Sequence, residues 1–333
     1  MTTRPSERRT APATATTTVP TTVPQGAQIA EPALLRGPGA ARGRPGAALR
    51  WLTAAIQTSR PRQWPKNLLV LAAPLAGASL GRGGVYAIVA IVAFTAASSA
   101  VYFVNDVVDA DRDRRHPVKR KRPVAAGTLS APQALALAVA AAGVALASGF
   151  LISAPWLSVT IAAYLAVSFL YSLALKHVPV LELACVASGF VLRALGGADA
   201  THVPPSGWFL TVISLGALMV AVAKRRGELS SLGPEAARHR PVMRWYSYGV
   251  LCTVGRAIAA GIIVSYALWA VSSFGGMREV WHLVSVVPLA VALARFDWLS
   301  VHGAGRAVED LIVTDRVMAG AEVAWLVTFA LGL

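Results

Sequence analysis

The chain has 333 residues, of which 55% are hydrophobic and only 14% are charged. Soluble domains carry roughly 25% charged residues, and the apolar residues here form runs that approach the ~20 residues needed to cross a hydrocarbon core. This composition excludes a soluble enzyme, a disulfide-stapled secreted domain and a disordered chain, and it predicts a polytopic membrane protein. The formal net charge of +15 does not indicate a nucleic-acid partner, because the basic residues are spread over loops between apolar segments.

The chain divides into two parts by composition. Residues 1–46 are rich in Thr, Pro, Ala and Gly and carry several arginines. Such a segment cannot bury enough surface to fold, so we expect a disordered basic tail that stays near an anionic leaflet. Residues 47–333 are expected to form a transmembrane catalytic domain.

The transmembrane part begins with an amphipathic segment over 47–58, followed by nine apolar stretches. Several of these stretches contain alanine and glycine, which allow helices to pack closely in lipid. The pattern therefore predicts an all-α membrane protein built as a bundle of nine transmembrane helices. The predicted spans are 66–81, 85–106, 131–150, 155–174, 180–197, 207–223, 247–273, 279–295 and 314–333.

The basic residues predict the orientation of this bundle. Most of the 31 Lys and Arg residues fall in the tail and in the loops after the second, fourth, sixth and eighth spans. Cytoplasmic loops hold the excess of such residues, so we expect a cytoplasmic N-terminus and a C-terminus on the opposite side.

A row of oxygen-bearing side chains ends the second span, in the order Asn105, Asp106, Asp109 and Asp113. If the helix continues, three of them recur every four residues and form a stripe about 12 Å long, with Asp106 beside it. Carboxylates at membrane depth repel one another unless a cation is bound, and Mg²⁺ prefers oxygen ligands shared with phosphates. The basic run that follows, which includes Arg120, suits a polyanionic substrate. A solvated charged loop is the alternative interpretation.

The spacing Asn-Asp-x-x-Asp-x-x-x-Asp over 105–113 resembles the motif of the UbiA-type intramembrane prenyltransferases, and the resemblance covers roughly residues 56–325. It implies a nine-helix bundle with a central cavity open to the cytoplasm and to lipid. It also implies Mg²⁺-dependent cleavage of a diphosphate. The implied metal ligands are Asn105, Asp106, Asp109 and Asp113, and the three aspartates are implied to be catalytic.

The second motif departs from the usual family pattern. Family members carry a further Asp-rich motif after the sixth helix, whereas this chain has Lys224-Arg225-Arg226-Gly227-Glu228 there. Together with the segments 60–67, 171–177 and Glu309-Asp310 to Asp315-Arg316, this resembles a branch of the family whose diphosphate substrate is 5-phosphoribosyl 1-diphosphate (PRPP). The alternative is a positive-inside helix end in which Lys224 and Glu228 form an i, i+4 pair.

The branch resemblance implies transfer of 5-phosphoribose from PRPP to a polyprenyl phosphate, expected to be decaprenyl phosphate, in the synthesis of cell-wall arabinan precursors. Lys224 and Glu228 are expected to act in catalysis, with Arg225 beside them near a substrate phosphate. The other expected substrate-binding residues are Lys66, Arg120, Tyr171, Lys176 and Arg193. Lys66, Tyr171 and Lys176 could equally be interface anchors, and Arg193 needs a partner or a polar cavity because it lies in an apolar span.

The resemblance further implies a multi-pass protein of the plasma membrane that forms a homo-oligomer, with a trimer as the candidate. Two other functions stay open. One is a prenyltransferase of the same fold that acts on an aromatic or glycerol-phosphate acceptor. The other is a transporter of polyprenyl lipids, which predicts charges near the bilayer midplane rather than a cluster at one end.

Overall fold

The computed structural model describes residues 45–77, 79–236, 240–302 and 314–333. Most of the tail predicted over 1–46 lies outside these ranges, as do Glu309 and Asp310. Within them the regular elements are all helices, which confirms the all-α prediction. With η for 3₁₀ helices, they are α1 (Pro45–Thr58), η1 (Pro61–Leu71), α2 (Ala72–Ala76), α3 (Leu80–Val108), α4 (Ala110–Arg114), η2 (Lys119–Lys121), α5 (Ala131–Leu151), α6 (Pro155–Leu173), η3 (Leu175–His177), α7 (Leu181–Thr201), α8 (Gly207–Leu232), η4 (Gly233–Glu235), η5 (Pro241–Trp245), α10 (Tyr248–Ser273), α11 (Met277–His302) and α13 (Arg316–Leu331).

Seven of the described helices are long and apolar enough to cross a membrane, namely α3, α5, α6, α7, α8, α10 and α11. They coincide with the second to eighth predicted spans, although α8 and α11 continue further, to Leu232 and His302. The last predicted span is the shorter helix α13, of 16 residues. These helices confirm an integral membrane protein.

The first predicted span, 66–81, differs most from the structure. Its first part belongs to the 3₁₀ helix η1, Ala72–Ala76 form the short helix α2, and its last two residues begin α3. Pro61 begins η1 and Pro65 lies inside it. Both prolines precede the predicted span, but Pro74 lies inside it, in α2, and lacks the N–H that would bond the carbonyl four residues earlier. This segment therefore does not form one continuous transmembrane α-helix.

Side-chain caps fix the starts of several helices. Ser130 and Gln133 form a capping box at the start of α5, where each side chain bonds the other residue's backbone N–H. Ser206 accepts the N–H of Phe209 at 3.1 Å and begins α8. These caps explain why the predicted starts of the two spans agree with the structure.

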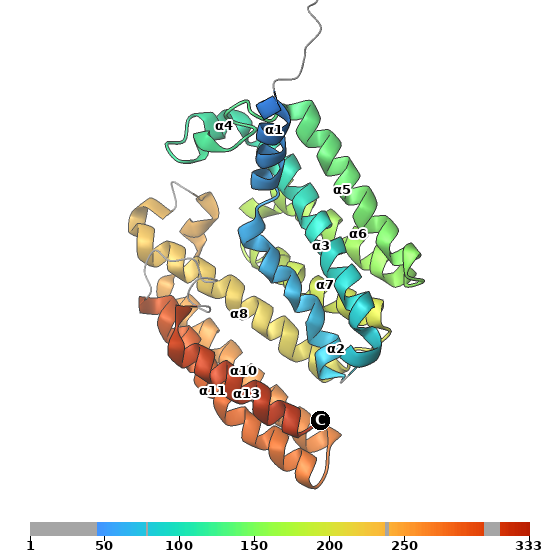
Figure 1. The fold of residues 1–333 in the computed structure, drawn as a ribbon. Coiled ribbons are helices and arrows are strands. Elements are labelled where there is room, and N and C mark those ends of the chain that lie inside the picture. Colours follow the sequence, from blue (N-terminus) through green and yellow to red (C-terminus); the bar gives the residue numbers. More distant parts are fainter. Residues whose placement is uncertain (1–44, 78, 237–239, 303–313) are drawn as a thin grey trace, which may run out of the picture. The chain divides into compact units, whose positions relative to one another are not determined.

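Helix α7 is the central element, because it packs against α3, α6, α8 and η1 (Figure 1). One apolar core, around Phe94, Leu157 and Ile161, joins α3, α5 and α6 and includes Ala200 of α7. A second core, around Val222 and Ile258, joins α7 and α8 to α10, α11 and α13. The two cores therefore meet at α7, which carries polar side chains between them.

Two close approaches define the direction of the helices around α7. A Cβ at Gly197 would lie 1.8 Å from the carbonyl oxygen of Val70, so η1 lies directly on a glycine of α7. A Cβ at Gly83 would lie 3.1 Å from the side chain of Thr201, so the start of α3 lies against the end of α7. Helices α3 and α7 are therefore antiparallel, and the end of α3 shares one side of the bundle with the start of α7.

Candidate active site

The predicted row of Asn105, Asp106, Asp109 and Asp113, hereafter the acidic row, spans the junction of α3 and α4. Asp109 separates the two helices, with φ −90° and ψ 0°. The N–H of Asp109 still bonds the carbonyl of Asn105 at 2.9 Å, and the N–H of Asp113 bonds that of Asp109 at 2.8 Å. Because hydrogen bonds from residue i to residue i−4 cross the junction, Asn105, Asp109 and Asp113 keep the shared stripe expected for a continuous helix.

Two carboxylates of the acidic row are buried and paired with arginines. Arg60 Nη2 lies 2.5 Å from Asp106 Oδ1. Arg122 Nη1 lies 2.7 Å from Asp113 Oδ2 and 3.4 Å from Asp106 Oδ1. The side chains of both aspartates are only 3% exposed, so these arginines supply the countercharge that burial demands.

The donor chemistry of the acidic row fits a hard divalent cation. Its carboxylate and amide oxygens are the ligands that Mg²⁺ prefers. One guanidinium nitrogen, Nη1 of Arg122, lies within 3.4 Å of carboxylate oxygens from both Asp106 and Asp113, so a single cation can be shared between them. Among the described residues, however, no three His, Cys, Asp or Glu side chains already form a group that could hold a metal. The arginines occupy the carboxylates instead.

A second polar cluster surrounds Glu182 at the start of α7. The carboxylate of Glu182 is fully buried and accepts Nε and Nη2 of Arg225 at 2.6 Å each. Arg240 Nη1 lies 3.4 Å from Glu182 Oε2 and 3.5 Å from the hydroxyl of Tyr171. Arg225 Nη1 also donates to Glu228 at 2.5 Å. We call these residues, Tyr171, Glu182, Arg225, Glu228 and Arg240, the Glu182 cluster.

The structure thus brings three predicted residues together and changes the expected pairing of one. Tyr171, Arg225 and Glu228 share the Glu182 cluster, where Glu228 pairs with Arg225 at i, i+3. Three nitrogens of Arg225 bond carboxylates, which leaves two of its five N–H groups for any other ligand. The phosphate contact expected of Arg225 therefore stays a prediction.

Tyr246 borders the Glu182 cluster from the end of η5. Its hydroxyl accepts the N–H of Val180 at 3.0 Å, just before α7 begins. Burial raises the pKa of the Tyr246 hydroxyl above its ordinary value, and the nearby Glu182 carboxylate acts in the same direction. The phenol therefore stays neutral at physiological pH and serves as a hydrogen-bonding group.

Arg193 finds its partners inside the protein. Its guanidinium donates to Asn67 Oδ1 at 2.7 Å, to the carbonyl of Gly189 at 2.6 Å and to the hydroxyl of Tyr164 at 3.0 Å. Asn67 in turn donates to Thr95 at 2.9 Å. This network joins η1, α3, α6 and α7, so Arg193 holds η1 in place, and any substrate contact by Arg193 stays a prediction.

Three of the four remaining predicted residues lie on the 3₁₀ helices η1, η2 and η3, and the fourth lies on α8. Lys66 is half-buried in η1, Arg120 is exposed in η2, and Lys176 is half-buried in η3, which packs on η5. Lys224 is half-buried on α8, one residue before Arg225. Because α3 and α7 are antiparallel, the acidic row and the Glu182 cluster both belong to the side of the bundle where these residues lie.

Sequence reasoning missed the arginine partners of the acidic row and the centre of the second cluster. Arg122 stands in the basic run that indicated a polyanionic substrate, and Arg60 stands in the segment 60–67 that carried part of the resemblance; neither pattern indicated an ion pair. Glu182 lies about three helical turns before Arg193, too far for a direct pair on one helix, so the spacing along the chain indicates no partner for it. A lone glutamate in an apolar span does indicate a buried ion pair, because such a carboxylate requires a cationic partner.

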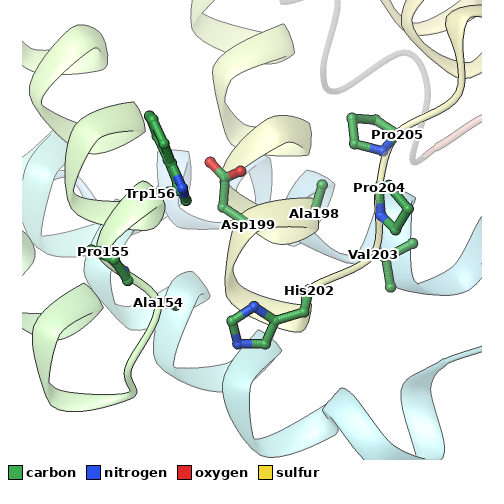
Figure 2. Close-up of a pocket in the computed structure, with 9 residues that line it drawn as sticks. All are labelled: Ala154, Pro155, Trp156, Ala198, Asp199, His202, Val203, Pro204 and Pro205. Carbon is green, nitrogen blue, oxygen red and sulfur yellow. The ribbon is translucent and has the colours of Figure 1, made fainter.

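A pocket of about 270 Å³ opens at the other side of the bundle, where α6 begins and α7 ends. Figure 2 shows Trp156, Asp199 and His202 around it, with Pro204 and Pro205 on the connection to α8. Asp199 Oδ2 accepts the hydroxyl of Thr160 at 2.5 Å. This pocket lies at the opposite end of α7 from Glu182, so it is separate from both polar clusters.

The comparisons with known proteins agree with this arrangement. Residues 68–309 match the model of the UbiA prenyltransferase family. A UbiA homolog from Archaeoglobus fulgidus, solved with GPP and Mg²⁺, superposes with a TM-score of 0.61 at 15% identity, covering 84% of this chain and 98% of that one. A digeranylgeranylglyceryl phosphate synthase structure gives a TM-score of 0.62 at 12% identity, covering 85% and 98%. The chain therefore belongs to the UbiA prenyltransferase family.

The relatives at 36–37% identity share one name. The decaprenyl-phosphate phosphoribosyltransferase of Mycobacterium tuberculosis is 37% identical over 286 residues, which are 83% of this chain and 93% of that protein. The enzyme of the same name from Mycolicibacterium smegmatis is 36% identical over 291 residues, covering 83% and 91%. The one from Corynebacterium glutamicum is 36% identical over 278 residues, covering 81% and 84%.

Proposed function

We propose that the chain transfers 5-phosphoribose from PRPP to decaprenyl phosphate and releases diphosphate, in a reaction that supplies precursors of cell-wall arabinan. The observation that carries this proposal is that the chain is 36–37% identical, over 83% of its length, to decaprenyl-phosphate phosphoribosyltransferases. The composition of the Glu182 cluster supports it, because arginines stand where a second metal-binding carboxylate motif is usual. In this reaction only PRPP carries a diphosphate, because the acceptor lipid is a monophosphate. One acidic row is therefore enough to bind the metal and the diphosphate.

Asn105, Asp106, Asp109 and Asp113 are the residues that would hold Mg²⁺. Bound there, the ion supplies charge neutralisation for the diphosphate as it leaves. The basic run that follows, including Arg120, binds the outer diphosphate oxygens through charge-assisted hydrogen bonds. Backbone hydrogen bonds continue across the junction of α3 and α4, so the side chains of Asn105, Asp109 and Asp113 stay on one stripe. This stripe orients the leaving diphosphate.

The nucleophile in this reaction is an oxygen of the lipid phosphate. A phosphate monoester has a second pKa near 6, so it is largely dianionic at pH 7 and needs no strong general base. The bond from ribose C1 to the diphosphate oxygen breaks as a bond from C1 to the lipid phosphate oxygen forms. The protein's contribution is positioning and electrostatics, with Lys66 on η1 as the proposed ligand of the lipid phosphate.

The Glu182 cluster holds the other end of PRPP in this proposal. Lys224 and Lys176 provide positive charge for the 5-phosphate, and Tyr171 donates its hydroxyl. The partly exposed carboxylate of Glu228 accepts hydrogen bonds from ribose hydroxyls, while Arg225 fixes its direction. Glu182 keeps Arg225 charged and in place. The two clusters thereby bind opposite ends of one substrate in a cavity open to the cytoplasm and to lipid.

The proposal includes a location and an assembly. Basic residues concentrate in the loops on the side of the acidic row, which supports a site facing the cytoplasm and a multi-pass protein of the plasma membrane. The described α13 and the η1–α2 segment are the proposed remaining members of a nine-span bundle. A homo-oligomer, with a trimer as the candidate, completes the proposal.

The experiment that tests this function measures diphosphate release by the purified protein in detergent. We expect release from PRPP that requires both Mg²⁺ and decaprenyl phosphate. Lys224→Ala should raise the apparent KM for PRPP, and an unchanged value would remove Lys224 from the site. Release from geranyl diphosphate with an aromatic acceptor, and none from PRPP, would overturn the proposal in favour of a prenyltransferase of the same fold.

A further inference from the structure

The two buried carboxylates of the acidic row, those of Asp106 and Asp113, are neutralised by arginines that come from outside α3 and α4. Arg60 precedes η1 and bonds Asp106 at 2.5 Å, while Arg122 follows η2 and bonds Asp113 at 2.7 Å. The carboxylate side chains are 3% exposed, whereas those of Arg60 and Arg122 are 31% and 29% exposed. The negative charges are thus fixed in the protein, and the positive charges reach them from the surface.

Arg122 occupies the position that a cation shared between Asp106 and Asp113 would require. Its Nη1 lies between Asp106 and Asp113, within 3.4 Å of an oxygen of each. A Mg²⁺ ion binds carboxylate oxygens at about 2.0–2.1 Å and demands octahedral geometry, so it needs the space between the two carboxylates. The guanidinium and a divalent ion therefore compete for one place.

Both arginines can leave without moving a long helix. Arg60 directly precedes η1 with φ 55°, and Arg122 directly follows η2 with ψ 140°, in an extended conformation. The side chain of Arg60 also lies over the ring of Tyr102, 4.6 Å from its centroid. Neither side chain belongs to a spanning helix and both are about one-third exposed, so turning either guanidinium away from the row requires no movement of such a helix.

We propose that Arg60 and Arg122 are resident counter-ions of the acidic row, displaced by the entering divalent cation and then turned onto the diphosphate of the substrate. This inference rests on the proposed function. Each guanidinium stabilises the empty row and afterwards offers a planar pair of donors to phosphate oxygens. The exchange keeps the buried carboxylates compensated at every stage, so that metal and diphosphate are bound together.

The test measures binding of Mn²⁺ alone, by electron paramagnetic resonance, to the full-length protein without substrate. Arg122→Gln and Arg60→Gln should tighten Mn²⁺ binding by about three- to tenfold, the effect of removing a partly exposed competing ion pair. Arg122→Lys, which keeps the charge, should stay near wild type. Arg295→Gln is the matched control, because Arg295 pairs with Asp315 at 2.7 Å and is also 29% exposed. Unchanged or weaker Mn²⁺ binding in both Gln variants would overturn the proposal.

A second measurement needs no variant. Hydrogen exchange in the wild-type protein should become faster at the backbone amides around η2 when Mg²⁺ is added, because Arg122 loses its anchor. Unchanged or slower exchange there would equally overturn the proposal. Both measurements use the metal alone, so they are independent of the substrate: release from geranyl diphosphate in place of PRPP would overturn the proposed function and leave this result standing.

Discussion

Glu182 at the start of α7 and Arg225 on α8 form a buried, two-point ion pair, with Nε and Nη2 each 2.6 Å from a carboxylate oxygen. The pair fastens two spanning helices at the level of the candidate site. Removing one partner of such a pair leaves an uncompensated buried charge, which costs about 3–5 kcal/mol. We therefore expect Glu182→Ala to lower the thermal unfolding temperature in detergent strongly.

Glu228→Gln is the matched control for that variant. Glu228 pairs with the same arginine at 2.5 Å, but its side chain is 36% exposed. Water can replace a partner at such a position, so the loss should be about 1 kcal/mol or less. If Glu182→Ala is no less stable than Glu228→Gln, the buried pair is not what fastens α7 to α8.

Variants of Asp109 and Asp113 should show that the effect on turnover is distinct from the effect on stability. Both belong to the acidic row, so Asp109→Asn and Asp113→Asn should each largely abolish turnover. Asp113 is buried against Arg122, whereas Asp109 is partly exposed and pairs with Arg112 at 2.5 Å. Only Asp113→Asn should therefore also lower the unfolding temperature, and turnover near the wild-type rate in either variant would contradict the metal assignment.

Gly197 should be intolerant of any side chain. A Cβ there would lie 1.8 Å from the carbonyl oxygen of Val70, so Gly197→Ala must push η1 away from α7. Such overpacking costs about 1–3 kcal/mol, and hydrogen exchange over residues 61–71 should become faster. Gly216→Ala on α8 is the control, because its Cβ meets nothing within 4 Å. Equal exchange in the two variants would contradict the close contact.

Asp315 should make the docking of α13 depend on pH. Its carboxylate bonds Arg295 and caps the N–H of Met318, and these bonds hold the pKa of Asp315 at about 2, below its ordinary 3.8. Because the folded pKa lies below the unfolded one, the stabilisation is present above about pH 4 and is lost as the pH falls towards 2. Asp315→Asn should lower the unfolding temperature at neutral pH, and its difference from wild type should shrink below pH 4. A constant difference would exclude this carboxylate as the cause.

The sequence predicted the helices better than the contacts between them. Apolar runs bounded by capping residues such as Ser130 and Ser206 located the starts of α5 and α8 correctly, because these signals are local. The first span was wrong as one α-helix: Pro65 stands directly before it within η1, and Pro74 interrupts the apolar pattern inside it.

The acidic row could be recognised from its spacing along one helix, whereas its arginine partners could not. Arg60 is 46 residues away from Asp106, and Arg193 is 126 residues away from Asn67. Such pairs depend on which helices become neighbours, and no local pattern records that. The fold brought Tyr171, Arg225 and Glu228 together around Glu182, a residue whose burial only the packing of α7 and α8 reveals.

The most direct test of the central claim follows the ribose carbon itself. Purified protein in detergent would receive [¹⁴C]PRPP, decaprenyl phosphate and Mg²⁺, and the lipid phase would be extracted and counted. The account predicts label in the lipid phase that disappears when Mg²⁺ is omitted and when Asp109 is replaced by Asn. Absence of label from the lipid under all of these conditions, from a folded and monodisperse protein, would contradict phosphoribosyl transfer.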